Sequence, residues 1–392
     1  MESAALDQLQ RVAAMAGCRR AVGMPDLHPG RGIPIGAAFA FDGVIRPGLV
    51  GGDAGCGALV VPVRRPKHSG DGLLRRVASE TEGAVLPELS RETLLGAAWA
   101  LGPAGLLALD GVPDGLVALV DQLAVPDGLP ESSLLPSGAA FADQLGTAGG
   151  GNHFVEISEV TSVADHALAS RWGLERHSVA VVAHSGSRQL GAVLAERWHD
   201  RELRAPEEQA AYLADLAGCI RYARTNRVLL AWRLLSALGA TREAQLGPAF
   251  DLVHNGVSAE AGLAQGACTC FLHRKGCAPA DSGEATIVLG SRGTVSWVME
   301  GLGNDRTLSS VAHGAGRRMT RSEAVHKLRE RHRRATLTRT KSGGTVLCDD
   351  PELLYAEHPD AYKPIEPVIT SLEAAGAARR VAALMPVVNV KR

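Results

Sequence analysis

The chain has 392 residues, enough to bury a sizeable core, and 46% hydrophobic with 21% charged residues is an ordinary globular composition. Its 41 Lys+Arg and 42 Asp+Glu nearly cancel, which excludes a uniformly basic nucleic-acid-binding protein, so contact with nucleic acid would require a local basic cleft. No window holds the roughly 18 uninterrupted apolar residues of a membrane helix, and the N-terminus lacks a signal-peptide pattern, so we expect a cytoplasmic protein without a membrane partner.

The first third of the chain is predicted to alternate between helix and strand. Residues 2–17 have the pattern of a short amphipathic helix. Residues 20–63 are predicted to form several short strands broken by Gly and Pro, for example at 36–41 and 58–63. Residues 69–135 are rich in Leu and Ala and are predicted to be helical with proline breaks.

The remainder continues the alternation. A buried strand is predicted at 179–184, a helical region at 205–247 and a strand-like segment at 284–299. A basic helix is predicted at 318–336, and the segment 345–392 combines helix with a last strand, PVVNV. Because no tandem repeat or low-complexity linker divides the chain, we expect an α+β fold in one compact domain over residues 1–392.

The cysteines argue against a disulfide scaffold, since there are seven and they are scattered. Cys268 and Cys270 form a C-x-C pair, but no second pair stands at zinc-finger spacing. We therefore predict that these two cysteines are buried strand residues.

Histidine is the commonest metal ligand in proteins and can act as a nucleophile. A single histidine beside glycine is more often structural than catalytic, but five such loops in one chain favour a site. The five are His28, His153, His184, His254 and His313. Others stand in charged or helical surroundings and are expected at the surface: His68, His166, His199, His326 and His332.

A second pattern is GGDAGCG at 51–57, which places Asp53 and Cys56 three residues apart in a glycine-rich loop. A carboxylate and a thiolate can share one metal ion or bridge two, and imidazoles from distant loops would complete the ligands. Alone, the motif would equally fit a tight turn with a buried cysteine. Together with the histidine loops it favours a metal site.

Four segments combine Gly, Ser and Arg, a composition that suits phosphate binding through backbone N–H groups and guanidinium forks. They are GTAGGGNH, HSGSRQLG, LGSRGT and HGAGRRMTR. None matches the P-loop pattern or a G-x-G-x-x-G turn between strand and helix. A nucleotide site in this chain would therefore be of a different type.

Placed in chain order, these loops resemble the RtcB family of RNA ligases. The similar segments are MPDLHPGRGIPIG (24–36), GGDAGCG (51–57), GTAGGGNHFVEI (146–157), HSGSRQLG (184–191), YARTNR (222–227), HNGVS (254–258), HRKG (273–276), LGSRGTVSWV (289–298), AHGAGRRMTR (312–321) and the closing PVVNVK (386–391). Any one of them is weak evidence, but their common order makes the resemblance specific.

The resemblance implies a single α+β domain of the RtcB type, with mixed sheets around a central metal and guanylate cleft. It implies that RNA with a 2′,3′-cyclic phosphate or 3′-phosphate is joined to RNA with a 5′-hydroxyl, using GTP and two Mn²⁺ ions. A metal-dependent RNA end-processing or 3′-guanylate capping enzyme without efficient sealing is the alternative. A non-catalytic binding protein is disfavoured, because a pseudoenzyme would be expected to lose at least one site residue.

The resemblance also assigns roles by position. His313 would carry GMP, and Cys56 would bridge two ions, one completed by Asp53 and His153 and the other by His184 and His254. Asn152 would contact the α-phosphate. The guanosine pocket would consist of Glu156, Ser291, Ser296 and Lys391, and the further phosphate or RNA contacts would be Arg188, Arg317 and Arg321.

The chain departs from the usual family pattern near the expected pocket. Leu289 replaces a proline, Arg292 a methionine and Ala54 an isoleucine, and Cys-Ala-Pro-Ala at 277–280 replaces Ala-Thr-Arg-Ala. All expected metal and guanylate positions remain filled. These changes suit RNA repair at least as well as tRNA splicing, and the natural RNA, the oligomeric state and any helper protein stay open.

Overall fold

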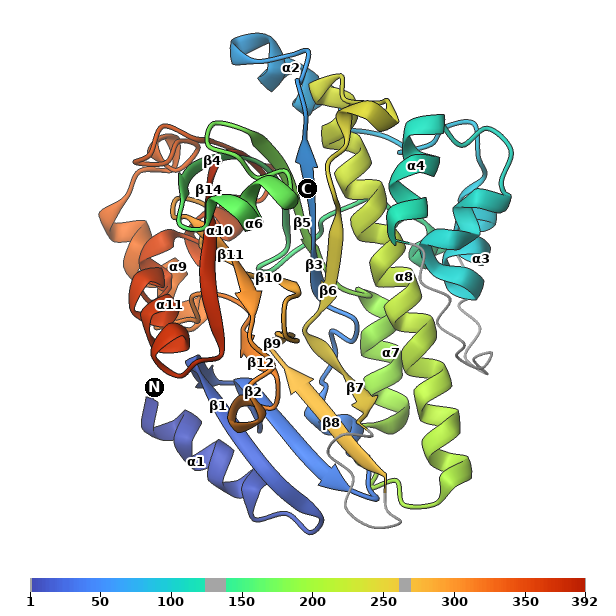
Figure 1. Ribbon diagram of the computed structural model, residues 1–392, viewed down its shortest axis with the longest axis vertical. Coiled ribbons are helices and arrows are strands. Elements are labelled where there is room, and N and C mark those ends of the chain that lie inside the picture. Colours follow the sequence, from blue (N-terminus) through green and yellow to red (C-terminus); the bar gives the residue numbers. More distant parts are fainter. Residues whose placement is uncertain (1, 124–138, 261–268, 392) are drawn as a thin grey trace.

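The computed structural model describes residues 2–123, 139–260 and 269–391. Figure 1 shows sheets in the middle of the molecule, with α8 along one side and α9 to α11 on the other. The strands are β1 (Cys18–Pro29), β2 (Pro34–Asp42), β3 (Gly57–Val63), β4 (Phe154–Val163), β5 (Val179–Ser185), β6 (Phe250–Val253), β7 (Asn255–Ala259), β8 (Cys270–Lys275), β9 (Cys277–Pro279), β10 (Ala285–Val288), β11 (Ser296–Gly301), β12 (Ser310–Ala312), β13 (Thr345–Cys348) and β14 (Ala378–Lys391). The α-helices are α1 (Glu2–Ala13), α2 (Gly70–Glu80), α3 (Arg91–Leu101), α4 (Asp114–Leu123), α5 (Ala139–Ala142), α6 (His166–Arg171), α7 (Gln189–Trp198), α8 (Pro206–Leu238), α9 (Arg321–Arg331), α10 (Pro351–Ala356) and α11 (Ile365–Ala374).

The main sheet has eight strands, in the order β10-β11-β14-β4-β5-β3-β6, with β13 beside β14. Every pair on this path is antiparallel, and β13 runs parallel to β14. A four-stranded sheet, β1-β2-β8-β7, and a small β12-β9 pair make up the rest. The sheet content confirms the α+β expectation.

Side-chain alternation places a core on each face of the main sheet. Leu59, Val61, Val181 and Ala183 point toward α8 and its neighbouring helices. Their neighbours in sequence, such as Val60, lie on the opposite face, which packs against the region of α6. The sheet is therefore covered on both sides, and the ends of its strands remain available for a site.

Most predicted elements are present, with changed bounds. The helix predicted at 2–17 is α1, the strand at 179–184 is β5, and the helical region at 205–247 is α8. The segment 284–299 contains two strands, β10 and β11, separated by a loop that lines the cavity described below. Within 69–135, the helices α2 to α4 agree with the prediction, and residues 124–135 lie outside the described chain.

The lengths of two predicted elements were wrong. The strands predicted as short within 20–63 include a long antiparallel hairpin, β1-β2, because pairing with β8 extends β2 through its alternating small and aromatic residues. The basic helix expected at 318–336 begins only at Arg321, after the capping residue Thr320, and ends at Arg331. Cys270 is buried on β8 as expected, and Cys268 lies outside the described residues.

In the described part of the chain, no helix is both long enough and apolar enough to cross a membrane.

Candidate functional site

Four neighbouring strands of the main sheet end together and bring four of the predicted ligands to one place. Cys56 directly precedes β3 and His153 directly precedes β4, whereas His184 lies near the end of β5 and His254 follows β6. Because β4, β5, β3 and β6 are adjacent and antiparallel, the starts of two strands lie beside the ends of the other two. The sheet topology therefore gathers residues separated by up to two hundred positions.

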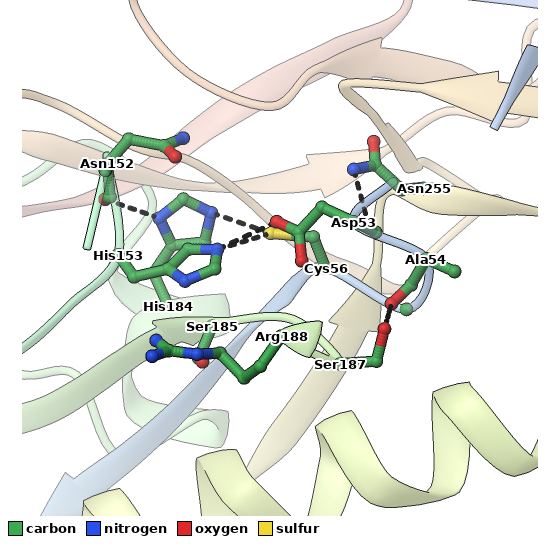
Figure 2. Close-up of polar contacts among 12 residues, drawn as sticks. Asp53, Ala54, Cys56, Asn152, His153, His184, Ser185, Ser187, Arg188 and Asn255 are labelled. Carbon is green, nitrogen blue, oxygen red and sulfur yellow. Dashed lines mark hydrogen bonds and ion pairs between the residues drawn. The ribbon is translucent and has the colours of Figure 1, made fainter. Parts of the chain in front are cut away.

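The side chains of Cys56, His153 and His184 point toward a common centre (Figure 2). The Cys56 Sγ lies 3.4 Å from Nε2 of both His153 and His184. The Nε2 atoms of His184 and His254 are also 3.4 Å apart. On the other side, His153 Nε2 lies 2.8 Å from an Asp53 carboxylate oxygen.

These atoms divide into two donor sets that share one sulfur. Cys56, His184 and His254 form one set, and Asp53, Cys56 and His153 form the other, with donor atoms within 4.8 Å of one another in each. Thiolate, imidazole and carboxylate together suit a transition-metal ion rather than Ca²⁺ or Mg²⁺. The arrangement fits two ions with Cys56 between them.

The protonation states of the histidine rings suit metal binding. Burial lowers the pKa of His184 and His254 well below its usual value, which keeps both rings in the neutral, ligating form. His184 Nδ1 lies 3.1 Å from the Asn152 carbonyl, so its N–H donates there and Nε2 keeps a free lone pair. Burial, then the Asp53 charge, raises the pKa of the Cys56 thiol, so a thiolate here requires a cation beside it.

Side chains of α8 hold the loop that carries Asp53 and Cys56 in place. The buried Arg227 guanidinium donates to the carbonyls of Gly55 and Ser185, at 2.8 Å each, and its other nitrogens pair with Asp251. The Ser187 hydroxyl donates to the Ala54 carbonyl (Figure 2). Gly55 has φ +73°, and a Cβ there would meet the α8 backbone at 3.0 Å, which explains why this position needs glycine.

A cavity of about 850 Å³ opens onto the metal centre. It extends from the donor sets past His313 to the loop after β10 and the end of β14. The predicted residues that line it are Asp53, Cys56, Asn152, His184, His254, Ser291, His313, Arg317, Arg321 and Lys391. His28, the fifth of the glycine-loop histidines, lines it as well.

His313 stands beside the metal centre and is oriented by a residue that sequence reasoning missed. Its Nδ1 lies 2.8 Å from Oδ2 of the buried Asp26 on β1, and its ring centroid lies 5.0 Å from that of His254. A Cβ at Gly276 would come within 3.0 Å of the imidazole, so glycine allows the close packing of this ring. Asp26 stands in the quoted MPDLHPGRG motif, but no local pattern pairs it with a histidine 287 positions away.

Two of the predicted guanosine residues lie behind the cavity wall. Glu156 is buried on β4, where its carboxylate accepts from Asn389 Nδ2 at 2.8 Å and from the Ser158 hydroxyl at 3.1 Å. Ser296 accepts from the Gly290 N–H at 2.9 Å and so fixes the loop after β10. Asn389 lines the cavity in front of Glu156 and was not among the predicted residues.

Lys391 and Arg292 are buried cations that line this cavity. Lys391 Nζ donates to the His153 carbonyl at 2.9 Å, and burial lowers the pKa of its amine to about 8. Arg292 is 6% exposed, and its Nη1 is a buried nitrogen without a hydrogen-bond partner in the described structure. Glu357, the nearby carboxylate that the sequence analysis also missed, is already paired with Arg317 and Arg321.

The remaining predicted residues have mixed positions. The Arg188 guanidinium donates to the Ala148 carbonyl and does not line the cavity. Of the histidines expected at the surface, some are exposed and others half-buried. The exposed ones are His166, His199 and His326, and the half-buried ones are His68 and His332.

The comparisons with known proteins all lead to one family. A family model described as "tRNA-splicing ligase RtcB" matches residues 8–100 and 130–392. The RNA-splicing ligase RtcB2 of Escherichia coli is 35% identical over 402 residues, covering 100% of this chain and 93% of that protein. The tRNA-splicing ligase RtcB of Archaeoglobus fulgidus is 30% identical over 441 residues, covering 98% and 90%. The RNA-splicing ligase RtcB of Mycobacterium tuberculosis is 30% identical over 444 residues, covering 98% and 100%.

The matches span nearly the whole chain and include every strand end of the metal centre, so the protein is an RNA ligase. It belongs to the RtcB family, as the order of its motifs predicted.

Proposed function

We propose that this RNA ligase joins RNA ending in a 2′,3′-cyclic phosphate or 3′-phosphate to RNA beginning with a 5′-hydroxyl, at the expense of GTP. In this proposal His313 attacks the α-phosphorus of GTP, so that a bond to GMP forms and pyrophosphate leaves, and GMP then passes to the RNA 3′-phosphate. A 2′,3′-cyclic phosphate end is first opened by water to give that 3′-phosphate. The 5′-hydroxyl then attacks that activated phosphate, and GMP leaves. The observation that carries the proposal is the position of His313. Its imidazole, held by Asp26, lines a cavity of about 850 Å³ that also opens onto the two donor sets.

The chemistry follows from the hydrogen bond between His313 and Asp26. With Nδ1–H donating to the buried carboxylate, the other ring nitrogen keeps its lone pair and can attack a phosphorus. Asp26 also stabilises the positive charge that the ring acquires when it forms the bond. Holding the ring in one orientation lowers the entropic cost of in-line attack.

The metal centre and the cationic wall neutralise the phosphates. Two Mn²⁺ ions bound by Asp53, Cys56, His153, His184 and His254 would supply Lewis-acid stabilisation of phosphate oxygens. Asn152 lines the same side of the cavity, and we assign it to the α-phosphate. The guanosine would lie toward Ser291 and Lys391, with Glu156 and Ser296 behind them.

The test is incubation with labelled GTP and Mn²⁺, followed by denaturing electrophoresis and then by addition of RNA with a 3′-phosphate and a 5′-hydroxyl. Label that stays with the protein and is lost as the RNA is sealed supports the proposal. Label that moves to the RNA end without a sealed product would support the capping alternative instead. Sealing that needs no GTP would contradict the proposal.

Glu156→Gln should make the nucleotide-free protein more stable at pH 8 and weaken its binding of GTP. Burial raises the pKa of Glu156 to about 7, above its usual value of 4.5, so the folded protein holds a proton that the unfolded chain has lost. Native stability therefore falls as pH rises from 4.5 through 7, by a total on the order of 3 kcal/mol. Glutamine does not ionise, so the nucleotide-free variant should be more stable than the parent at pH 8 and about equal at pH 4.5.

Urea denaturation at both pH values measures this effect, with the exposed Glu88→Gln as the matched control. The same variant should bind GTP more weakly by about 1–3 kcal/mol, because the carboxylate that orients Asn389 at the cavity wall is replaced by an amide. Titration of guanylation with GTP and with ITP, which lacks the exocyclic amine, measures that part. An equal stability difference at both pH values would show that Glu156 does not titrate as described.

Arg292→Met should stabilise the empty protein and weaken its response to GTP. The buried guanidinium has an unpartnered nitrogen, and its nearest carboxylate already serves two other arginines. Removing such a group should raise the free energy of unfolding by about 1–3 kcal/mol. Urea denaturation with and without GTP is the measurement, and Arg292→Lys is the control that keeps the charge. A less stable empty Arg292→Met protein would refute the prediction.

A further inference from the structure

A strongly basic surface segment lies next to the cavity and has no role in the chemistry above. Residues 331–341, here called the basic segment, follow α9 and contain five basic residues and no acidic one. The five are Arg331, Arg333, Arg334, Arg339 and Lys341. Since the whole chain has a net charge of −1, the rest of the protein carries net negative charge. The basic segment is therefore a local excess of positive charge on a chain that is otherwise net negative.

The charges of the basic segment are available to a ligand. All five side chains are exposed. Within residues 2–123, 139–260 and 269–391, no ion pair is formed by any of them, unlike Arg329 on α9, which pairs with Glu352. An exposed cluster of unpaired arginines repels itself, and a polyanion relieves that repulsion.

The backbone of the basic segment is nevertheless held in place. Leu337, in its middle, is buried in a small core with Leu328 of α9 and Val346 of β13. The Tyr355 hydroxyl donates to the His332 carbonyl at 3.3 Å. The segment is thus a fixed platform for its charges, which limits the ordering cost of binding.

The basic segment approaches the cavity wall at its C-terminal end and is joined to that wall through α9 at its N-terminal end. Its N-terminal end joins α9, whose first residue, Arg321, lines the cavity. Near its C-terminal end, Thr340 packs against Gly293, where an added Cβ would lie 3.5 Å from the threonine Cβ. Gly293 belongs to the loop after β10, and its neighbours Ser291 and Arg292 line the cavity. A chain leaving the cavity over this wall meets the basic segment.

We infer that the basic segment is a docking surface for the RNA backbone, several nucleotides away from the ends that are joined. This inference rests on the proposed function, because it places the reacting RNA end in the His313 cavity. Arg331 lies ten residues after Arg321, which places the two about 15 Å apart along α9. At roughly 3.4 Å per nucleotide along a strand, the contacts would fall about four to five nucleotides beyond Arg321. Arginine and lysine side chains that contact phosphates read no base edges, so the docking would be independent of sequence.

The test compares two triple variants that remove the same charge. Arg331, Arg333 and Arg334 are changed to alanine in one protein. The matched control changes Arg75, Arg76 and Arg176, which are exposed and have no ion pair in the described structure, to alanine. The probe is a fluorescent single-stranded RNA of about 20 nucleotides with a 3′-phosphate, measured by anisotropy over a series of salt concentrations. A second probe of about four nucleotides is too short to reach the basic segment.

The basic-segment variant should bind the long RNA at least tenfold more weakly at low salt. The slope of log affinity against log salt should fall by about two, since three phosphate contacts each contribute about 0.7. Binding of the short RNA and the amount of labelled GMP attached should equal those of the control. Because GMP attachment requires no RNA, its failure in the parent protein would count against the proposed function, whereas the anisotropy would still test the docking surface. Equal affinities and salt slopes in the two variants would overturn the inference.

Discussion

His313→Ala should attach no labelled GMP at all. The remaining segment, Ala-Ala-Gly-Ala-Gly-Arg, offers no side chain that could attack a phosphorus in place of the imidazole. The metal donor sets do not include His313, so the variant should keep its metal content and its fold. The measurement is denaturing electrophoresis after incubation with labelled GTP and Mn²⁺, with metal analysis of the same sample.

Asp26→Asn is the companion variant for the same step. It preserves size but presents an amide to His313 Nδ1, so the ring is no longer held in the tautomer that leaves the other nitrogen free. Label should still attach, at a rate lower by about 10²–10⁴-fold, as expected when an orienting carboxylate is neutralised. RNA that already carries a 3′-guanylate should be sealed by both variants, since that step does not need the imidazole. Label on the His313→Ala protein would rule this residue out as the nucleophile.

Cys56→Ala should lose metal from both donor sets together, because its sulfur is the only atom common to the two. We expect Mn²⁺ content to fall to background and GMP attachment and sealing to disappear. His254→Ala provides the contrast, since it removes a donor from one set and leaves Asp53, Cys56 and His153 intact. Metal analysis after dialysis measures the stoichiometry of each protein.

The control for Cys56 is Cys270→Ala, another buried cysteine, which lies on β8 of the other sheet. It should retain full metal content and activity. Zn²⁺ should displace Mn²⁺ from the parent protein, because sulfur and nitrogen donors bind it more tightly in the general affinity order. A Cys56→Ala protein with full metal content and ligation would show that the shared-sulfur arrangement is wrong.

The sequence was most informative where chemistry and periodicity are local. The continuous apolar run at 179–184 predicted the buried strand β5, and the long helical pattern of 205–247 predicted α8. Glycine beside histidine predicted the five loops whose side chains gather at the cavity or its metal centre. The resemblance to the RtcB family then predicted which of these histidines share a metal ion. Residue types alone could not make that assignment.

The sequence was least informative about contacts between side chains that lie far apart in the chain. Asp26 and His313 come from different sheets, and Asn389 faces Glu156 across the β4-β14 pair. The packing of one sheet against another decides the first contact and the register of β4 with β14 decides the second, and no spacing in the chain encodes either. Glu156 was expected in the guanosine pocket, but it lies behind Asn389 and does not line the cavity.

The position of β14 has a consequence for how the protein is made. This strand lies between β11 and β4 and brings Asn389 and Lys391 to the cavity. A ribosome adding roughly 5–20 residues per second makes β4 and β5 at least about 10 s before β14 can pair with them. Until then the nascent chain exposes an unpaired strand edge. Such an edge can pair with another chain and aggregate unless a chaperone binds it. A chain that stops before residue 378, such as one translated from a severed message, lacks the middle of the sheet and cannot seal RNA.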